Sequence, residues 1–170
     1  RRRYAIGGFG AIYRASQVTN NRKVAIKVMH AELGADANLV ARFRREGVAL
    51  CSLRDAHTVT TYEMDETPDG RLFIVMELLD GRNLLEVFRA TGPLPWRRVL
   101  AIARSACSAL AEAHGLGITH RDLKPANIFL EERRAGGDFV KVLDFGIAKI
   151  TQGSGIDDGS ELTIMGQAVG

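Results

Sequence analysis

The hydrophobic pattern of the chain changes from strand-like to helical near Asp80 and Gly81. Before this point, short runs rich in β-branched side chains are typical of strands. They lie at residues 11–15, 23–29, 59–64 and 72–76. Beyond it, apolar residues recur at helical spacing, most clearly from Trp96 to His114. This order of patterns predicts an α+β fold.

The two patterns divide the chain into a β-rich part, residues 1–78, and a mainly helical part, residues 79–170. One helix is expected in the first part, capped by Asp36 or Asn38 and ending near Leu53. A short hinge is expected to join the two parts. A ligand crevice between them is the natural expectation for such an arrangement.

Composition and charge exclude several classes of protein. The 46% apolar and 25% charged residues are those of an ordinary globular domain, and no run approaches the roughly 18 apolar residues of a membrane-spanning helix. Cys51 and Cys107 lack CxxC spacing and are expected to be reduced thiols of a cytosolic protein. Basic residues gather in the first 50 positions without interleaved aromatic residues, which favours a solvated face. We therefore expect a cytoplasmic chain with no nucleic-acid partner and no membrane contact of its own.

Two candidate motifs lie in the β-rich part. Gly7, Gly8 and Gly10 cluster in the turn of the opening hairpin, where backbone N–H groups can approach a phosphate without an intervening Cβ. Lys27 lies on a strand between apolar neighbours. Taken alone, a glycine cluster in a turn is more often structural than phosphate-binding, and a lysine on a strand is equally compatible with a solvated side chain.

Two further motifs follow the long helix and carry most of the chemistry. The sequence H-R-D-L-K-P-A-N at residues 120–127 puts a carboxylate, a cation and an amide oxygen into one loop. Such a set suits a hydroxyl nucleophile, a transferring phosphoryl group and Mg²⁺. The sequence D-F-G at residues 144–146 follows an apolar strand, and a carboxylate at that point is well placed to hold a metal ion.

In this order, the four motifs resemble the signature set of a eukaryotic-type (Hanks-type) Ser/Thr protein kinase domain. Residues 43–46 resemble the αC segment of that family, and residues 73–81 resemble its gatekeeper and hinge. The amino-acid sequences of residues 117–120 and 141–149 resemble the bacterial members of the family most closely. The resemblance implies a two-lobe kinase fold. Its N-terminal lobe would hold the glycine loop, the lysine strand and the αC-like helix, and the partial C-terminal lobe would hold the hinge end, the catalytic loop, D-F-G and the activation segment.

The resemblance also implies a catalytic set. Lys27 would contact the α- and β-phosphates of ATP, and Glu46 would hold Lys27 in place by an ion pair. Asp122 would accept or orient the substrate hydroxyl, and Lys124 would neutralise charge on the γ-phosphate. Lys124 also marks Ser/Thr rather than Tyr specificity in this family.

Two cofactors, ATP and Mg²⁺ with Mn²⁺ as an alternative, are implied in the same way. The metal ions would be held by Asn127 and Asp144. The implied nucleotide contacts are Gly7, Gly8, Gly10, Ala25, Lys27, Met76, Glu77, Leu79 and Phe129.

A hydrophobic spine that links the lobes is a further expectation from the resemblance. Leu50, Tyr62, His120 and Phe145 are expected to stack on one another. The family uses the residue at His120 for packing and hydrogen bonding, so a general base is not expected there.

The sequence departs from the family pattern near both ends. Ala5 stands where the glycine loop has its first glycine. The run 162–170 resembles the one that leads into the family's A-P-E block, and the chain stops before that block. We therefore expect one incomplete domain, with an apolar patch exposed on the long helix from Trp96 and poor solubility or partial melting of the isolated chain.

Phosphorylation of the activation segment is expected at Thr163, with Thr151 and Ser160 as weaker candidates. Arg121 would then pair with the phosphate. A homodimer would allow such autophosphorylation.

The resulting functional expectation is Mg²⁺-dependent transfer of the ATP γ-phosphate to Ser/Thr hydroxyls of protein substrates in signalling. A pseudokinase or ATP-binding scaffold is one alternative, although no catalytic position is vacant. A small-molecule kinase is another, and the L-K-P and D-F-G sequences argue against it. The third alternative is an inactive fragment that lacks most of its helical lobe. Regions outside this chain could tether the protein to a membrane.

Overall fold

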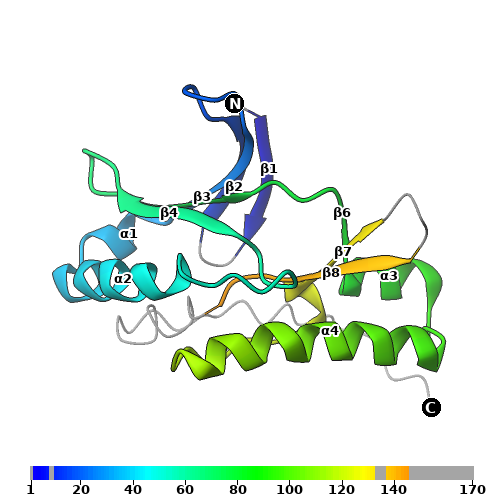
Figure 1. The fold of residues 1–170 in the computed structure, drawn as a ribbon. Helices are drawn as coiled ribbons and strands as arrows, with labels where there is room; N and C mark the ends of the chain where they lie inside the picture. Colours follow the sequence, from blue (N-terminus) through cyan, green and yellow to red (C-terminus); the bar gives the residue numbers. More distant parts are fainter. Residues whose placement is uncertain (1, 8–9, 133–136, 146–170) are drawn as a thin grey trace, which may run out of the picture.

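The computed structural model describes residues 2–7, 10–132 and 137–145. Figure 1 shows a larger sheet in the upper part of the view, with helix α2 (Ala37–Leu50) below one end of it. A smaller sheet and helix α4 (Trp96–Gly115) form the lower part. This is the α+β, two-lobe arrangement that the sequence predicts. Strand β5 ends at Glu77, and the boundary after residue 78 stays a prediction.

The larger sheet has five antiparallel strands in the order β1-β2-β3-β5-β4. Its strands are β1 (Arg2–Gly7), β2 (Gly10–Ser16), β3 (Lys23–Met29), β4 (Thr61–Glu66) and β5 (Leu72–Glu77). Because side chains alternate along a strand, Ala25, Lys27 and Met29 share one face of β3, and all three are buried. The lysine is thus on the packed face of the sheet.

Helix α2 follows the short helix α1 (Ala31–Gly34). Asp36 is its N-cap, because the Asp36 side chain accepts hydrogen bonds from the backbone N–H groups of Asn38 and Leu39 at 2.9 and 3.3 Å. The helix ends at Leu50, slightly earlier than predicted. Phe43 is fully buried beneath the sheet, and its core cluster is Met29, Leu33, Leu39, Phe43, Leu72 and Ile74.

A β-bulge in β4 overturns one predicted member of the spine. Thr61 pairs with Met76 and Glu63 pairs with Val75, so Tyr62 is the extra residue that reverses the alternation. Tyr62 is 39% exposed, with the Arg22 guanidinium 4.7 Å from its ring centroid. Met64 faces inward instead and packs against the core clusters of both lobes. The prediction that Tyr62 joins the spine is therefore wrong, whereas Met64 packs against the cluster that contains Leu50 and Phe145.

The helical part begins with strand β6 (Gly81–Asn83) and helix α3 (Leu84–Thr91), which starts at a capping box between Asn83 and Glu86. The remaining elements are α4, a 3₁₀ turn η1 (Pro125–Asn127), β7 (Ile128–Glu132) and β8 (Asp138–Val142). Strands β6, β7 and β8 form the second sheet in that order. In the part of the chain that the structure describes, no helix has the length and hydrophobicity needed to cross a bilayer.

A buried cluster joins the two lobes. Leu50, the last residue of α2, and Leu53, just beyond the helix, pack with the small residues of α4 and with Val142 and Phe145. The segment 57–59 also bonds to β8, because Val142 N–H donates to His57 O at 2.7 Å and Val59 N–H donates to Val142 O at 3.0 Å. The end of β8 is therefore fixed to both lobes.

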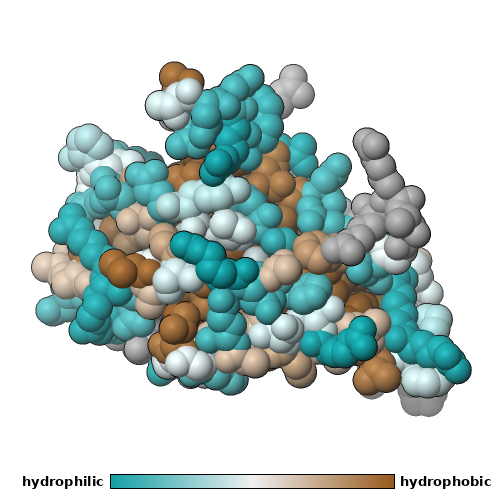
Figure 2. Space-filling view, in the orientation of Figure 1, coloured by the Kyte–Doolittle hydropathy of each residue, from teal (hydrophilic) through white to brown (hydrophobic). Residues whose placement is uncertain are grey.

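Apolar side chains on α4 remain exposed, as the sequence predicts, and Phe88 of α3 is exposed as well. Trp96, Val99 and Leu100 of α4 are 68, 48 and 60% exposed. Phe88, Leu94, Val99 and neighbouring residues line an apolar cavity of about 320 Å³. On the face drawn in Figure 2, apolar side chains form small spots between hydrophilic ones. The solubility of the isolated chain stays a prediction.

Candidate active site

Lys27 and Asp144 form a part-buried ion pair between the two lobes. Lys27 Nζ lies 2.9 Å from Asp144 Oδ1, and the two side chains are 5 and 30% exposed. Asp144 follows β8 and has a φ of 59°, a left-handed conformation that is uncommon for a residue other than glycine. Such local strain persists only where the surrounding structure imposes it, and it is common at functional sites.

The loop that contains Asp122 brings three predicted residues together. Asn127 Nδ2 donates to the backbone O of Asp122 at 2.8 Å and to its Oδ2 at 3.1 Å. Lys124 Nζ lies 3.0 Å from the same Oδ2. Arg121 has a φ of 65°, which turns the chain sharply just before Asp122. The carboxylate is thus held from one side by a cation and an amide.

One backbone bond attaches this loop to the Asp144 segment. Leu143 N–H donates to Asn127 O at 2.9 Å, and Asn127 itself is buried within the 3₁₀ turn η1. Since Leu143 directly precedes Asp144, the carboxylates of Asp122 and Asp144 belong to adjoining segments. Residues 122–127 and 144 are therefore one site rather than two.

His120 lies beneath the loop and is 2% exposed. Its Nδ1 accepts a hydrogen bond from Asp122 N–H at 3.3 Å, so the imidazole is neutral with its proton on Nε2, which is 2.8 Å from Leu143 O. Burial lowers the pKa of His120, against the opposing effects of the bond to Leu143 and the carboxylates of Asp144 and Asp122. Its ring centroid is 4.8 Å from that of Phe145. Both ring nitrogens are in use, which fits packing and orientation rather than proton transfer.

The donor set at Asn127 and Asp144 fits a hard divalent cation. Asn127 directs its Nδ2 toward Asp122, which leaves the amide oxygen on the other branch, and Lys27 contacts one of the two oxygens of Asp144. Within residues 2–7, 10–132 and 137–145, no group of three or more His, Cys, Asp or Glu side chains could hold a metal ion. Mg²⁺ is commonly bound by one or two protein oxygens together with phosphates and waters, so the two residues match its requirements.

Glu46 lies on α2, one helical turn before Leu50, with its side chain 19% exposed. Its Oε1 is 3.4 Å from an Arg45 guanidinium nitrogen. The ion pair between Glu46 and Lys27 stays a prediction.

The predicted adenine contacts lie on neighbouring strands. Ala25 and Met76 are partners in the β3–β5 register, and Ala25 is buried on the same face as Lys27. Phe129 is on β7 of the other lobe. Glu77 N–H donates to Thr60 O at 3.0 Å, so this N–H is not available to a ligand. Leu79 follows β5 in the connection to β6.

The glycine cluster is described in part. Gly7 and Gly10 are partners where β1 and β2 meet. A Cβ at Gly10 would lie 2.0 Å from Val28 O, so this position requires glycine. Gly8 and the phosphorylation candidates Thr151, Ser160 and Thr163 lie outside the described residues.

The sequence reasoning missed two residues near the site. Met64 packs against the cluster of Leu50 and Phe145 and was missed, although an apolar residue two positions after Tyr62 was the available signal. Lys141 was also missed: it is 7% exposed, and its Nζ is 2.6 Å from Glu77 Oε1. The sequence signal that could have identified Lys141 is the presence of a lysine within the otherwise apolar strand 140–143.

Comparison with known proteins agrees with this geometry. The family model described as "Protein kinase domain" matches residues 5–163, and the chain belongs to that family. Membership implies the use of ATP and a divalent metal ion in general terms.

Two of the similar curated proteins illustrate the relationship, and both are bacterial. The chain is 44% identical over 164 residues to serine/threonine-protein kinase pkn3 of Myxococcus xanthus, covering 96% of this chain and 30% of that protein. It is 38% identical over 165 residues to PknB of Mycolicibacterium smegmatis, covering 95% of this chain and 26% of that protein. The chain thus spans less than a third of the length of these relatives.

Solved structures share the fold. The PknI kinase domain of Mycobacterium tuberculosis matches with a TM-score of 0.77 at 29% identity, over 92% of this chain and 66% of that one. A double mutant of the same domain gives a TM-score of 0.79 at 28% identity, with the same coverage of both chains. The described residues therefore have the protein-kinase fold.

Proposed function

We propose that this chain forms the nucleotide-binding and catalytic part of a protein serine/threonine kinase, which transfers the γ-phosphate of ATP to Ser or Thr hydroxyls of proteins. The proposal is based on one observation: Lys27, Asp144 and the loop 120–127 lie together in one site. The printed names of the curated relatives support the Ser/Thr class.

In this proposal the N-terminal lobe and the hinge bind ATP. Lys27 holds the α- and β-phosphates, and Glu46 pairs with Lys27. The backbone of Gly7, Gly8 and Gly10 covers the phosphates. Ala25 and Met76 above and Phe129 below enclose the adenine, with hydrogen bonds from the backbone of Glu77 and Leu79. Burial of Lys27 supports this role, because a cation in a site of low dielectric interacts more strongly with phosphate than one in water.

The C-terminal lobe positions the acceptor hydroxyl. Both contacts to the Asp122 carboxylate, from Lys124 and from Asn127, are made to Oδ2, so Oδ1 is the oxygen offered to a substrate hydroxyl. Lys124 is half-exposed, and its ammonium group can also reach a transferring phosphoryl group. Phosphoryl transfer needs positioning and charge neutralisation rather than a covalent intermediate, and these residues supply both.

Asn127 and Asp144 would hold Mg²⁺, with Mn²⁺ as an alternative. When bound, the metal would neutralise negative charge on the phosphates. In this proposal the Asp144 carboxylate contacts two cations, the Lys27 ammonium group and the metal ion. Asn127 also holds the Asp122 carboxylate in place by a hydrogen bond.

Autophosphorylation belongs to the same proposal. Thr163, Thr151 and Ser160 are the candidate acceptors, and Arg121, which is exposed beside Asp122, would pair with the added phosphate. A transient homodimer would bring one active site to the activation segment of the other copy. Mass mapping of the full-length natural protein after incubation with ATP should locate phosphate between residues 147 and 170.

The test of the proposed function uses the full-length natural protein. We expect Mg²⁺-dependent transfer of labelled γ-phosphate from ATP to a basic protein substrate, and loss of that transfer in Asp122→Asn. Asp69→Asn, which changes an exposed loop carboxylate, is the matched control. ATP binding without any transfer by the unsubstituted protein would overturn the proposal in favour of an ATP-binding scaffold.

A further inference from the structure

Lys141 is a buried cation that the proposed mechanism does not use. Its side chain is 9% exposed, and Nζ lies 2.6 Å from Glu77 Oε1. The same Nζ donates to the backbone O of Thr58 at 3.3 Å. A buried ammonium group is costly unless it is paired and hydrogen-bonded, so these partners hold Lys141 in a defined place.

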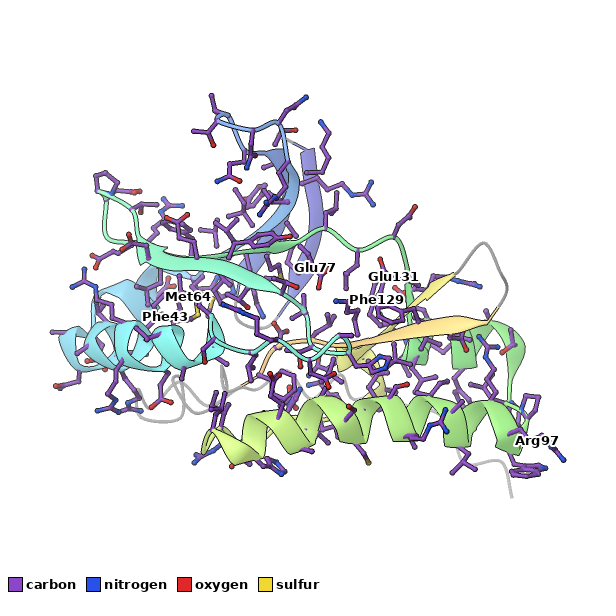
Figure 3. The ribbon with its side chains drawn as sticks, viewed as in Figure 1. Phe43, Met64, Glu77, Arg97, Phe129 and Glu131 are labelled. Carbon is purple, nitrogen blue, oxygen red and sulfur yellow. The ribbon has the colours of Figure 1, made fainter. Side chains whose placement is uncertain are left out.

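Glu77 connects this cation to the hinge. Its Oε1 also accepts the backbone N–H of Thr60 at 2.7 Å, and its own N–H donates to Thr60 O at 3.0 Å. Glu77 is therefore fixed through both its backbone and its side chain. Glu77 is the last residue of β5, and Figure 3 labels it between the larger sheet and the smaller sheet that carries Phe129.

Strand β8 connects the same cation to the catalytic site. Lys141 lies three residues before Asp144, and it is the cross-strand partner of Phe129 on β7. Cross-strand partners present their side chains on one face of a sheet. One ion pair thus links the hinge, the proposed floor of the adenine site and the strand that presents Asp144.

We propose that Lys141 and Glu77 are positioning residues for the bound nucleotide. Their ion pair fixes the hinge peptide relative to β8, so that adenine held at the hinge places its phosphates at Lys27 and Asp144. This inference rests on the proposed function, because it concerns ATP at that site. Neither side chain touches the reacting atoms; each acts through the backbone that it holds.

A second ion pair on β8 provides a matched control. Arg98 of α4 binds Asp138, the first residue of β8, through two contacts of 2.7 and 2.8 Å. These two residues line a hollow of about 760 Å³ that contains none of the predicted site residues. Loss of either ion pair should lower the stability of the protein, whereas only the loss of Lys141 should weaken the binding of the nucleotide.

The experiment compares Lys141→Met, Glu77→Gln, the double variant and Arg98→Met in the full-length natural protein. The quantities measured are KM for ATP, kcat, the Kd of Mg-ATP and the melting temperature. We expect Lys141→Met to raise KM and Kd about ten-fold with a smaller change in kcat, because a charge-assisted contact that orients the hinge is lost. The double variant should equal the worse single variant, since the two residues act as one unit.

Arg98→Met should lower the melting temperature while KM and Kd stay within about two-fold of the unsubstituted protein. The inference is overturned if Lys141→Met leaves KM and Kd unchanged, if kcat rises, or if Arg98→Met raises KM equally. Failure of the proposed function is a separate result, namely no phosphate transfer by the unsubstituted protein. In that case the Kd of Mg-ATP for the same variants still decides the positioning role.

Discussion

Lys27 Nζ lies 2.9 Å from Asp144 Oδ1, although 117 residues separate them along the chain. The contact crosses from the five-stranded sheet of the N-terminal lobe to the end of β8 in the C-terminal lobe. It fixes where a phosphate chain would lie, because one side of the contact is a buried cation and the other a carboxylate suited to a metal ion.

Replacing Lys27 tests this contact directly. Lys27→Met should lower kcat/KM for phosphate transfer by a factor of at least about 100, because a preorganised cation at developing phosphate charge is lost. Lys23→Met is the control on the same strand, since Lys23 is exposed and its ammonium group donates to Ser16 Oγ. Near-normal transfer by Lys27→Met would contradict the assigned role.

Asn127 should control the requirement for metal ion. Asn127→Leu removes the amide oxygen and also the bonds to Asp122. We expect the Mg²⁺ concentration for half-maximal activity to rise several-fold, by roughly the effect of losing one hard oxygen ligand. Activity is titrated with Mg²⁺ at fixed ATP, and Asn38→Ala, on the exposed face of α2, should leave the titration unchanged.

The buried His120 should make stability depend on pH. Because burial lowers its pKa in the folded state below the ordinary value of 6.5, the unfolded chain binds more protons between the two values. Its contribution to stability is therefore full above pH 6.5 and is lost as the pH falls through that value toward the lowered pKa. Melting temperatures between pH 8 and pH 5 should fall less steeply in His120→Asn, whereas exposed His114→Asn should keep the original slope.

The bulge in β4 predicts different losses of stability for substitutions at Met64 and at Tyr62. Met64→Ala should destabilise the protein by about 2–5 kcal/mol, because Met64 packs between two core clusters and would leave a cavity. Tyr62→Ala should cost less than about 1 kcal/mol, because the Tyr62 ring is exposed at the surface. Urea unfolding measures both, and equal costs would argue against this register.

The apolar cavity beside α3 predicts the behaviour of the isolated 170-residue chain. Phe88 and Val99 border this cavity and are 50 and 48% exposed. The isolated chain should bind a dye that fluoresces on apolar surface, and Phe88→Glu should reduce that fluorescence. A sharp cooperative melt without dye binding would contradict this expectation.

The sequence by itself predicted the order of the main strands and helices and the residues of the loop 120–127. Asp122, Lys124 and Asn127 lie within one short loop, so their proximity follows from local geometry. The strand and helix patterns were equally local, and they predicted β3 and α4 correctly. Asp36 rather than Asn38 as the cap of α2 needed the actual hydrogen bonds.

Only the tertiary structure decided which side chains face which partners across the lobes. One extra residue in β4 placed Tyr62 at the surface while Met64 packs against the core, because a bulge reverses the alternation of a strand without changing its composition. Lys141 became a buried cation because Glu77, 64 residues away in the chain, lies opposite it. Patterns along a sequence report periodicity, whereas the burial of a charge depends on a partner that only the packed fold supplies.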